Sequence, residues 1–372
     1  MPEEKSVPRI VGLDTLRAVA IALVLVYHHA VVIPGPSSLG VLSQIGWSGV
    51  DLFFVLSGYL IGNQILGAFA RGERFSPGTF FARRLLRTLP NYYAVLAVYW
   101  LLPSLLAGSD TAPLWRFLTF TQNLDLKYGQ TFTHSWSLCI EEQFYVILPF
   151  AVMAIAGFRR SVRLGWMVLA AAILAGMTAR GLAWANSGHT AFNQEVYYSS
   201  FTRLDELLPG VAIAMLKNFH REHYERLLRH WNGLLVAGAA SVAVLLIGFN
   251  TDAVASGFVL TSLGFSLLSM GFALLTLAAL SPDSLLNRLR VPGAGSLALW
   301  SYAIYLAHKP IYKMMIEPLD RMGLDPHGAV GVAIVMAAGV LGGWVLHKAV
   351  ETPFMQLRER HFPAQRFSRT AM

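Results

Sequence analysis

The sequence predicts an all-α, polytopic integral membrane protein that forms one domain over residues 1–372. Hydrophobic residues make up 55% of the chain and charged residues 13%, and the mean hydropathy is +0.51. Soluble proteins carry about 25% charged residues, so this composition argues against a soluble enzyme. The apolar residues also gather in stretches of the length that a helix needs to cross a bilayer, about 20 residues.

We expect about ten transmembrane helices, each justified by one such apolar stretch. In chain order they cover residues 16–33, 47–66, 89–107, 137–157, 164–184, 204–216, 233–249, 257–280, 295–316 and 328–347. The sixth stretch is short for a full span, and Pro310 predicts a kink or an end in the ninth. No signal peptide is expected, because the N-terminal residues lack an apolar stretch that ends in a small-residue cleavage site.

Basic residues orient these helices. Most of the 29 Lys and Arg residues, Lys5, Arg9, Arg366 and Arg369 among them, fall in segments on the side of the N-terminus. Cytosolic loops carry an excess of Lys and Arg, so both termini are predicted to be cytosolic. This bias explains the net charge of +8. Nucleic acid is not an expected partner, because the basic residues border apolar spans and do not alternate with aromatics.

The first predicted helix carries two ionisable residues on one face. The interval from Arg17 to His28 turns the helix by about 1100°, within about 20° of the same face, and rises about 16.5 Å. Asp51 enters the second helix at the depth of His28, so we expect its carboxylate to orient the imidazole as a base. The alternative is a buried His and Asp that satisfy one another as packing.

The segment RGERFSPGTFFARRLLRTLP is the most basic internal loop of the sequence. Arg83 and Arg87 are four residues apart and share a helix face, and Arg84 lies between them. Because arginine forks match phosphate oxygens, this pattern predicts an anion-binding clamp. The alternative is a plain cytosolic retention signal.

The fourth predicted helix opens with THSWSLCIEEQFY. Glu141 and Glu142 lie in its first two turns, where the positive end of the helix dipole favours carboxylates, and His134 stands at the helix mouth. These three residues are candidate catalytic groups, and glutamates that only mark the membrane interface are the alternative. Cys139 lies off this face, so we do not expect its thiol to act as a nucleophile.

Two later helices add ionisable residues. Arg203 and Asp205 begin the sixth helix, two residues apart and so not facing each other, and we place them at the membrane edge. His308 lies nearer the outer side of the ninth helix and is a further catalytic candidate. Lys309 and Lys313 also fall inside that helix.

Taken in order, these segments resemble the acyltransferase-3 family of polytopic membrane acyltransferases, which O-acylate sugars, glycans and some macrolides. The resemblance extends from Leu13 to Phe354. The sequence departs at Ala307, where the family often has an aromatic residue. Many relatives also carry a C-terminal hydrolase-like domain, and we expect the stand-alone form here. The matching segments are Arg17-x10-His28, GVDLFFVLSGYLI, RRLLRTLP, HSWSLCIEEQFY, TRLDELLPG, SYAIYLAH and ETPF.

The resemblance implies an O-acyltransferase of the bacterial plasma (inner) membrane. Its donor would be acetyl-CoA or another acyl-CoA, and its acceptor a hydroxyl of a sugar or glycan, lipid-linked forms included, on the external side. No metal and no permanently bound cofactor are expected, and membrane lipids surround the chain. The implied site consists of an acyl-CoA-binding set, Arg17, Arg83, Arg84 and Arg87, and a catalytic set, His28, Asp51, His134, Glu141, Glu142 and His308.

In this scheme His28 acts as a general base on the acceptor hydroxyl or carries the acyl group briefly. A secondary transporter or acyl-group carrier, in which the same residues form a relay, is the main alternative. Such a transporter would predict two related halves, and the sequence shows no internal symmetry. The other large family of membrane-bound O-acyltransferases is disfavoured by the order of the motifs.

Overall fold

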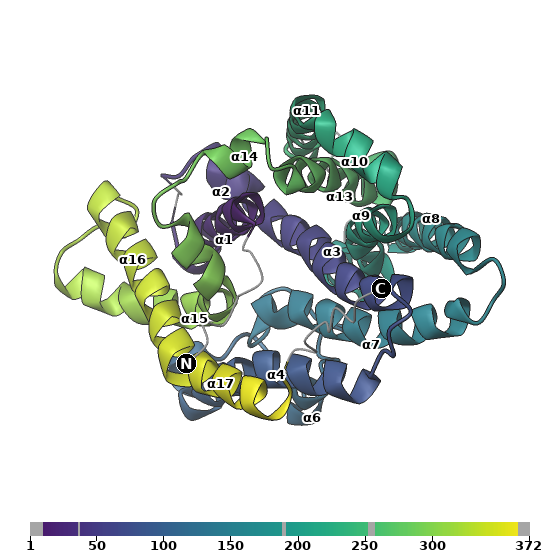
Figure 1. Cartoon of the computed structure of the whole chain (residues 1–372). Helices are drawn as coiled ribbons and strands as arrows, with labels where there is room; N and C mark the ends of the chain where they lie inside the picture. Colours follow the sequence, from purple (N-terminus) through teal and green to yellow (C-terminus); the bar gives the residue numbers. More distant parts are fainter. Residues whose placement is uncertain (1–9, 36–37, 188–190, 252–256, 364–372) are drawn as a thin grey trace.

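A computed structural model describes residues 10–35, 38–187, 191–251 and 257–363, and all regular structure in these ranges is helical (Figure 1). The predicted all-α, polytopic class is confirmed. Seven helical segments in this part of the chain are long and apolar enough to cross a membrane. They are α1 (Val11–Val32), α3 (Ser48–Ala70), Thr133–Ala156 with α7 (Trp136–Ala156), α8 (Ser161–Ser187), α11 (Trp231–Phe249), α13 (Phe258–Leu280) and Ala329–His361, which begins with α16 (Ala329–Leu346).

The other three predicted spans are helical but do not belong to this set of seven. α4 (Pro77–Leu101) and α15 (Ala294–Arg321) have 25 and 28 residues but are rich in polar and charged side chains. The sixth predicted span consists of η4 (Leu204–Leu207) and α9 (Leu208–Phe219), which has only 12 residues. The count of ten and the cytosolic termini therefore stay predictions, and Lys5, Arg9, Arg366 and Arg369 lie outside the described residues.

Two helices differ from their predicted limits. α4 begins at Pro77, 12 residues before the predicted span, so one helix continues from the basic segment with its expected arginine face into the apolar stretch; Ser76 caps it by accepting from the amide of Thr79. α15 continues through Pro310 to Arg321, so the helix does not end at that proline. The remaining helices are short: α2 (Val41–Ile45), α5 (Pro103–Leu106), α6 (Leu114–Leu118), η1 (Thr133–Ser135), η2 (Phe192–Tyr197), η3 (Ser200–Thr202), α10 (Arg221–Arg229), α14 (Leu285–Arg288), η5 (His347–Glu351) and α17 (Thr352–His361).

α1 and α3 lie at the centre of the bundle (Figure 1). α3 packs along α9, and α1 packs along α15, which in turn packs on α16. Gly58 of α3 and Gly210 of α9 allow the first contact, since a Cβ at Gly58 would overlap the carbonyl of Leu207 and one at Gly210 that of Val55. Small residues let helices approach closely where lipid leaves van der Waals contact as the main attraction.

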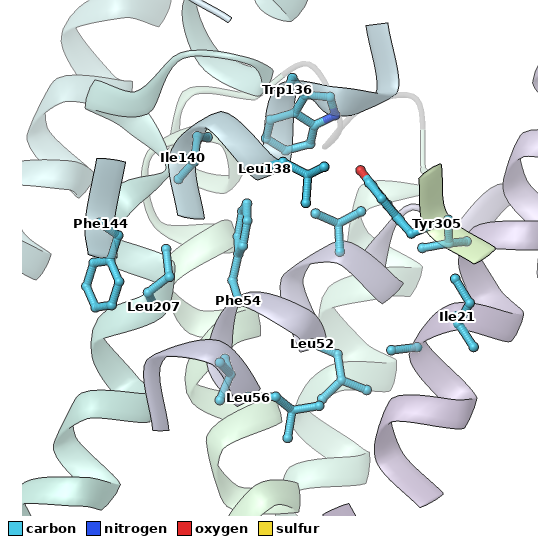
Figure 2. Packing of buried hydrophobic residues seen from close by; sticks show 14 of the residues in the cluster. Ile21, Leu52, Phe54, Leu56, Trp136, Leu138, Ile140, Phe144, Leu207 and Tyr305 are labelled. Carbon is cyan, nitrogen blue, oxygen red and sulfur yellow. The ribbon is translucent and has the colours of Figure 1, made fainter. Parts of the chain in front are cut away.

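The buried apolar core lies where α1, α3 and α7 meet (Figure 2). Ile21 of α1, Phe54 of α3 and Ile140 of α7 are fully buried there. Leu207 joins from η4, and Tyr305 joins from α15 with its hydroxyl directed towards α7 (Figure 2). This core packs together three of the helices that carry the ionisable residues described next.

Candidate active site

A cavity of about 630 Å³, here called the arginine cavity, lies between α1, α3, α4, α7 and α15. Its volume is within the range of pockets that hold small molecules and cofactors. The four predicted donor-binding arginines, from α1 and α4, all line it. Three further arginines line it as well, so the full set is Arg17, Arg71, Arg74, Arg83, Arg84, Arg87 and Arg358.

These arginines differ in whether they already form ion pairs with carboxylates of the protein. Arg83 forms an ion pair of 2.9 Å with Glu359 of α17. Arg84 lies 3.8 Å above the ring of Tyr145 and 4.0 Å from Glu142. Arg87 forms no ion pair with a carboxylate in the described part of the chain. Of the α4 arginines, Arg87 is therefore the most available to an anionic ligand.

Glu141 and Glu142 also line the arginine cavity. Glu141 accepts hydrogen bonds from the hydroxyls of Ser57, at 3.0 Å, and Tyr145, at 2.9 Å. Both bonds hold the carboxylate of Glu141, a predicted catalytic group, in this cavity. The structure thus places both glutamates with the arginines instead of with the histidines.

Three histidines from distant parts of the chain form a cluster. The ring centroid of His28 lies 4.8 Å from that of His308 and 6.1 Å from that of His134, and the latter two lie 5.3 Å apart. His134, expected at the helix mouth, is 1% exposed. The structure therefore brings together the three predicted catalytic histidines, from α1, η1 and α15.

The hydrogen bonds of these imidazoles fix their tautomers. His28 Nδ1 lies 3.1 Å from the carbonyl oxygen of Val24, and His308 Nδ1 lies 3.0 Å from that of Ile304. His134 instead uses Nε2, at 3.2 Å from the carbonyl of Leu306. A carbonyl only accepts, so each of these nitrogens carries the hydrogen. Each opposite nitrogen keeps its lone pair and can accept a proton.

A second cavity of about 210 Å³, here called the histidine cavity, adjoins this cluster. His28 and His134 line it, together with Lys309 and Lys313 of α15. Aromatic residues form much of its wall and suit stacking against an apolar ring face. They are Tyr27, Trp47, Tyr99, Tyr128, Phe132, Trp136, Tyr197 and Tyr198.

The two cavities lie end to end, because α1, α7 and α15 each contribute to both. Val50 of α3 lines both cavities. Next to it, the hydroxyl of Tyr305 donates to the carbonyl of His134 at 2.5 Å and lies 2.6 Å from Ser137 Oγ. Val50, Ser137 and Tyr305, here called the partition, separate the arginines from the histidines.

Asp51 does not contact His28 as predicted. Its carboxylate is fully buried and accepts from Arg203 Nη2 at 3.0 Å. The reason is helix periodicity: Val50 faces the cavities, and the next side chain points about 100° away. The expected His–Asp pair is thus replaced by the His28–Val24 and Asp51–Arg203 contacts.

Arg203 and Asp205, predicted at the membrane edge, are both buried inside the bundle. Arg203 also pairs with Glu206 at 2.7 Å, and Asp205 forms a bidentate pair with Arg180 of α8. Sequence reasoning missed both networks. The spacing of Arg203 and Glu206, three residues apart in a helix, and the position of Arg180 in an apolar stretch were the available signals.

Arg203 also supports the wall of the histidine cavity. Its guanidinium carbon lies 5.3 Å from the ring centroid of Trp136 and 4.9 Å from that of Tyr197, two residues that line this cavity. The same guanidinium carbon lies 4.0 Å from the ring centroid of Phe265. The buried ion pairs therefore connect Asp51 to the aromatic wall and not to the imidazole.

Comparisons with known proteins identify the family to which the chain is related. The family model described as "Acyltransferase domain" matches residues 10–348. The chain is 30% identical over 336 residues to the "Putative peptidoglycan O-acetyltransferase YrhL" of Bacillus subtilis, covering 84% of this chain and 50% of that protein. It is 26% identical over 382 residues to the "O-acetyltransferase OatA" of Staphylococcus aureus, covering 96% and 58%. The chain thus spans about half the length of these curated relatives. No solved structure matches it.

Proposed function

We propose that this chain, which belongs to the Acyltransferase domain family, transfers an acyl group from acyl-CoA to a hydroxyl of a glycan across the membrane. The observation that carries this proposal is the pair of cavities placed end to end, one rich in arginine and one lined by histidine. The names of the relatives, which refer to O-acetyl transfer and to peptidoglycan, support acetyl as the acyl group and a glycan as the acceptor.

The donor binds in the arginine cavity. Coenzyme A carries three phosphate groups, and guanidinium groups bind phosphate oxygens through paired hydrogen bonds. Arg87 and Arg17 are well placed for this role, because both line the cavity and neither forms an ion pair with a described carboxylate. The excess of basic residues supports a cytosolic location for this end of the bundle.

The acyl arm then extends along α1. From Arg17 to His28 the helix rises about 16.5 Å, comparable to an extended phosphopantetheine arm. To reach the imidazole, the arm passes the partition, where only Val50 lines both cavities. Rotation of the Tyr305 side chain, which breaks two hydrogen bonds, opens this route.

His28 Nε2 acts as the general base in this scheme. It removes the proton of the acceptor hydroxyl while that oxygen attacks the thioester carbonyl. The tetrahedral intermediate collapses by breaking the carbon–sulfur bond, and the imidazolium returns the proton to the leaving thiolate. The products are the O-acylated sugar and free CoA. An acyl-histidine intermediate is the alternative route, with the same overall balance.

The test uses the full-length chain in proteoliposomes with radiolabelled acetyl-CoA inside and a glycan acceptor outside. His28→Gln should abolish labelled product at equal protein content. The matched control is His29→Gln, because His29 is also buried in α1 but bonds to the carbonyl of Pro326 away from both cavities. Product from His28→Gln, or an equal loss in both variants, would refute the assignment. Solute transport without CoA release would favour the transporter.

A further inference from the structure

The histidine cavity carries a positive charge that catalysis by His28 does not explain. Lys309 and Lys313 are four residues apart on one face of α15, and both line this cavity. Lys309 directly follows His308 and lines the cavity together with His28 and His134. Two like charges at this spacing destabilise a helix, so we expect an anionic group nearby that offsets their repulsion.

The described part of the chain does not supply this compensation. No Asp or Glu is among the described residues that line the histidine cavity. Within the described residues Lys309 makes no ion pair or hydrogen bond, and Lys313 has only long contacts of 3.4 and 3.5 Å to the carbonyls of Leu106 and Ala107. Glu317, one turn further along α15, is paired with Arg321. A cation held in such surroundings is stabilised most effectively by a bound anion.

We propose that the acceptor is an anionic sugar, and that Lys309 binds a carboxylate or phosphate oxygen carried beside the hydroxyl that is acylated. This inference rests on the proposed function of the same site. Because Lys309 lines the same cavity as His28 and His134 and directly follows His308, the anionic group belongs to the sugar that reacts at this cluster. Lys313, one turn away, provides a second contact, and the aromatic wall stacks on the sugar ring.

The first arm of the test measures acetyl transfer to three sugars that share one ring: N-acetylglucosamine, N-acetylmuramic acid and N-acetylglucosamine 1-phosphate. They differ in having no anion, a carboxylate or a phosphate. Wild type should show a KM for at least one anionic sugar that is lower by on the order of tenfold than for the neutral sugar. The sugar with the lower KM shows whether the site binds a carboxylate or a phosphate.

Variants of the lysine complete this arm. Lys309→Met, which keeps the length of the side chain, should remove the preference, and Lys309→Arg should retain most of it. Lys348→Met is the matched control, because this exposed lysine lies outside both cavities. Equal KM values for charged and neutral sugars in wild type, or an equal loss for all three sugars in Lys309→Met, would overturn the proposal.

The second arm measures binding without transfer. Trp47 and Trp136 line the histidine cavity, so their fluorescence reports an acceptor that binds there. In the His28→Gln variant without acyl-CoA, the anionic sugar should bind more tightly than the neutral one, and Lys309→Met should abolish the difference. Anion-selective binding with no transfer by wild type would refute the proposed function alone, whereas transfer without anion selectivity would refute this inference alone.

Discussion

Replacing Arg203 by methionine should destabilise the protein far more than replacing Asp51 by asparagine. The guanidinium is fully buried and faces two carboxyl groups, Asp51 at 3.0 Å and Glu206 at 2.7 Å. Arg203→Met leaves both without a cation, whereas Asp51→Asn leaves Arg203 paired with Glu206. One guanidinium shared by two carboxyl groups therefore predicts an asymmetry that a simple ion pair would not show.

The size of the effect follows from these contacts. At an effective dielectric constant of about 20, each contact contributes roughly 5–6 kcal/mol of gross attraction. Most of this is offset by the desolvation of the charges, so removing one partner of a buried pair costs about 3–5 kcal/mol. Arg203→Met breaks two such contacts and belongs at the upper end of that range. Asp51→Asn should cost about 1–2 kcal/mol, the value of a buried hydrogen bond.

The single cysteine provides the assay. Cys139 is fully buried in α7, so a thiol-reactive dye labels it only when the protein unfolds. In a thermal melt in detergent, Arg203→Met should lower the midpoint on the order of 10 °C and Asp51→Asn by a few degrees. The triple variant Asp51→Asn, Arg203→Met, Glu206→Gln should recover much of the loss, because no buried charge remains. Equal shifts for the two single variants, or no recovery in the triple variant, would refute this reasoning.

Further predictions concern the donor site, the partition and the helix contact. Arg87→Met should raise the KM for acyl-CoA on the order of tenfold and Arg83→Met by less, since Glu359 already engages Arg83; steady-state kinetics would contradict this if the order were reversed. Tyr305→Phe should change kcat with little effect on the KM for acyl-CoA, because its hydroxyl belongs to the partition and not to the arginines that bind the donor. A change in KM alone would argue against the partition as a barrier to the acyl arm. Gly58→Ala should destabilise the protein by about 1–3 kcal/mol of overpacking and so lower the melting midpoint in the Cys139 assay. Gly78→Ala, with open space around it, should leave the midpoint unchanged; equal midpoints would contradict the close contact of α3 with Leu207, which caps α9.

Local periodicity predicted much of the candidate site. The interval between Arg17 and His28 is set by a continuous helix, and α1 places the two residues at the two cavities as expected. The arginines of α4 likewise share one helix face because of their spacing. Their helix begins earlier than predicted, although Ser76 and Pro77 are a typical cap and first position that the sequence displays.

Contacts between side chains of different helices were harder to predict from the sequence. Depth along two helices placed Asp51 level with His28, but depth does not determine which way a side chain points, and a rotation of about 100° separates Asp51 from Val50. The meeting of His134 and His308 likewise depends on how η1 packs on α15. Residues that contact one another across the bundle leave no periodic signal in a single sequence, whereas the local pair of Arg203 and Glu206 does.

The pairing of Asp51 with Arg203 also has a consequence for how the chain is made. The two residues are 152 positions apart, and Asp51 is synthesised first. At about 5–20 residues per second, roughly 8–30 s separate their emergence from the ribosome. During that interval α3 carries an acidic group in its first turn without its cation. The ion pair of Asp51 forms only when the segment that begins with Arg203 arrives, so the packing around this end of α3 is completed late in synthesis.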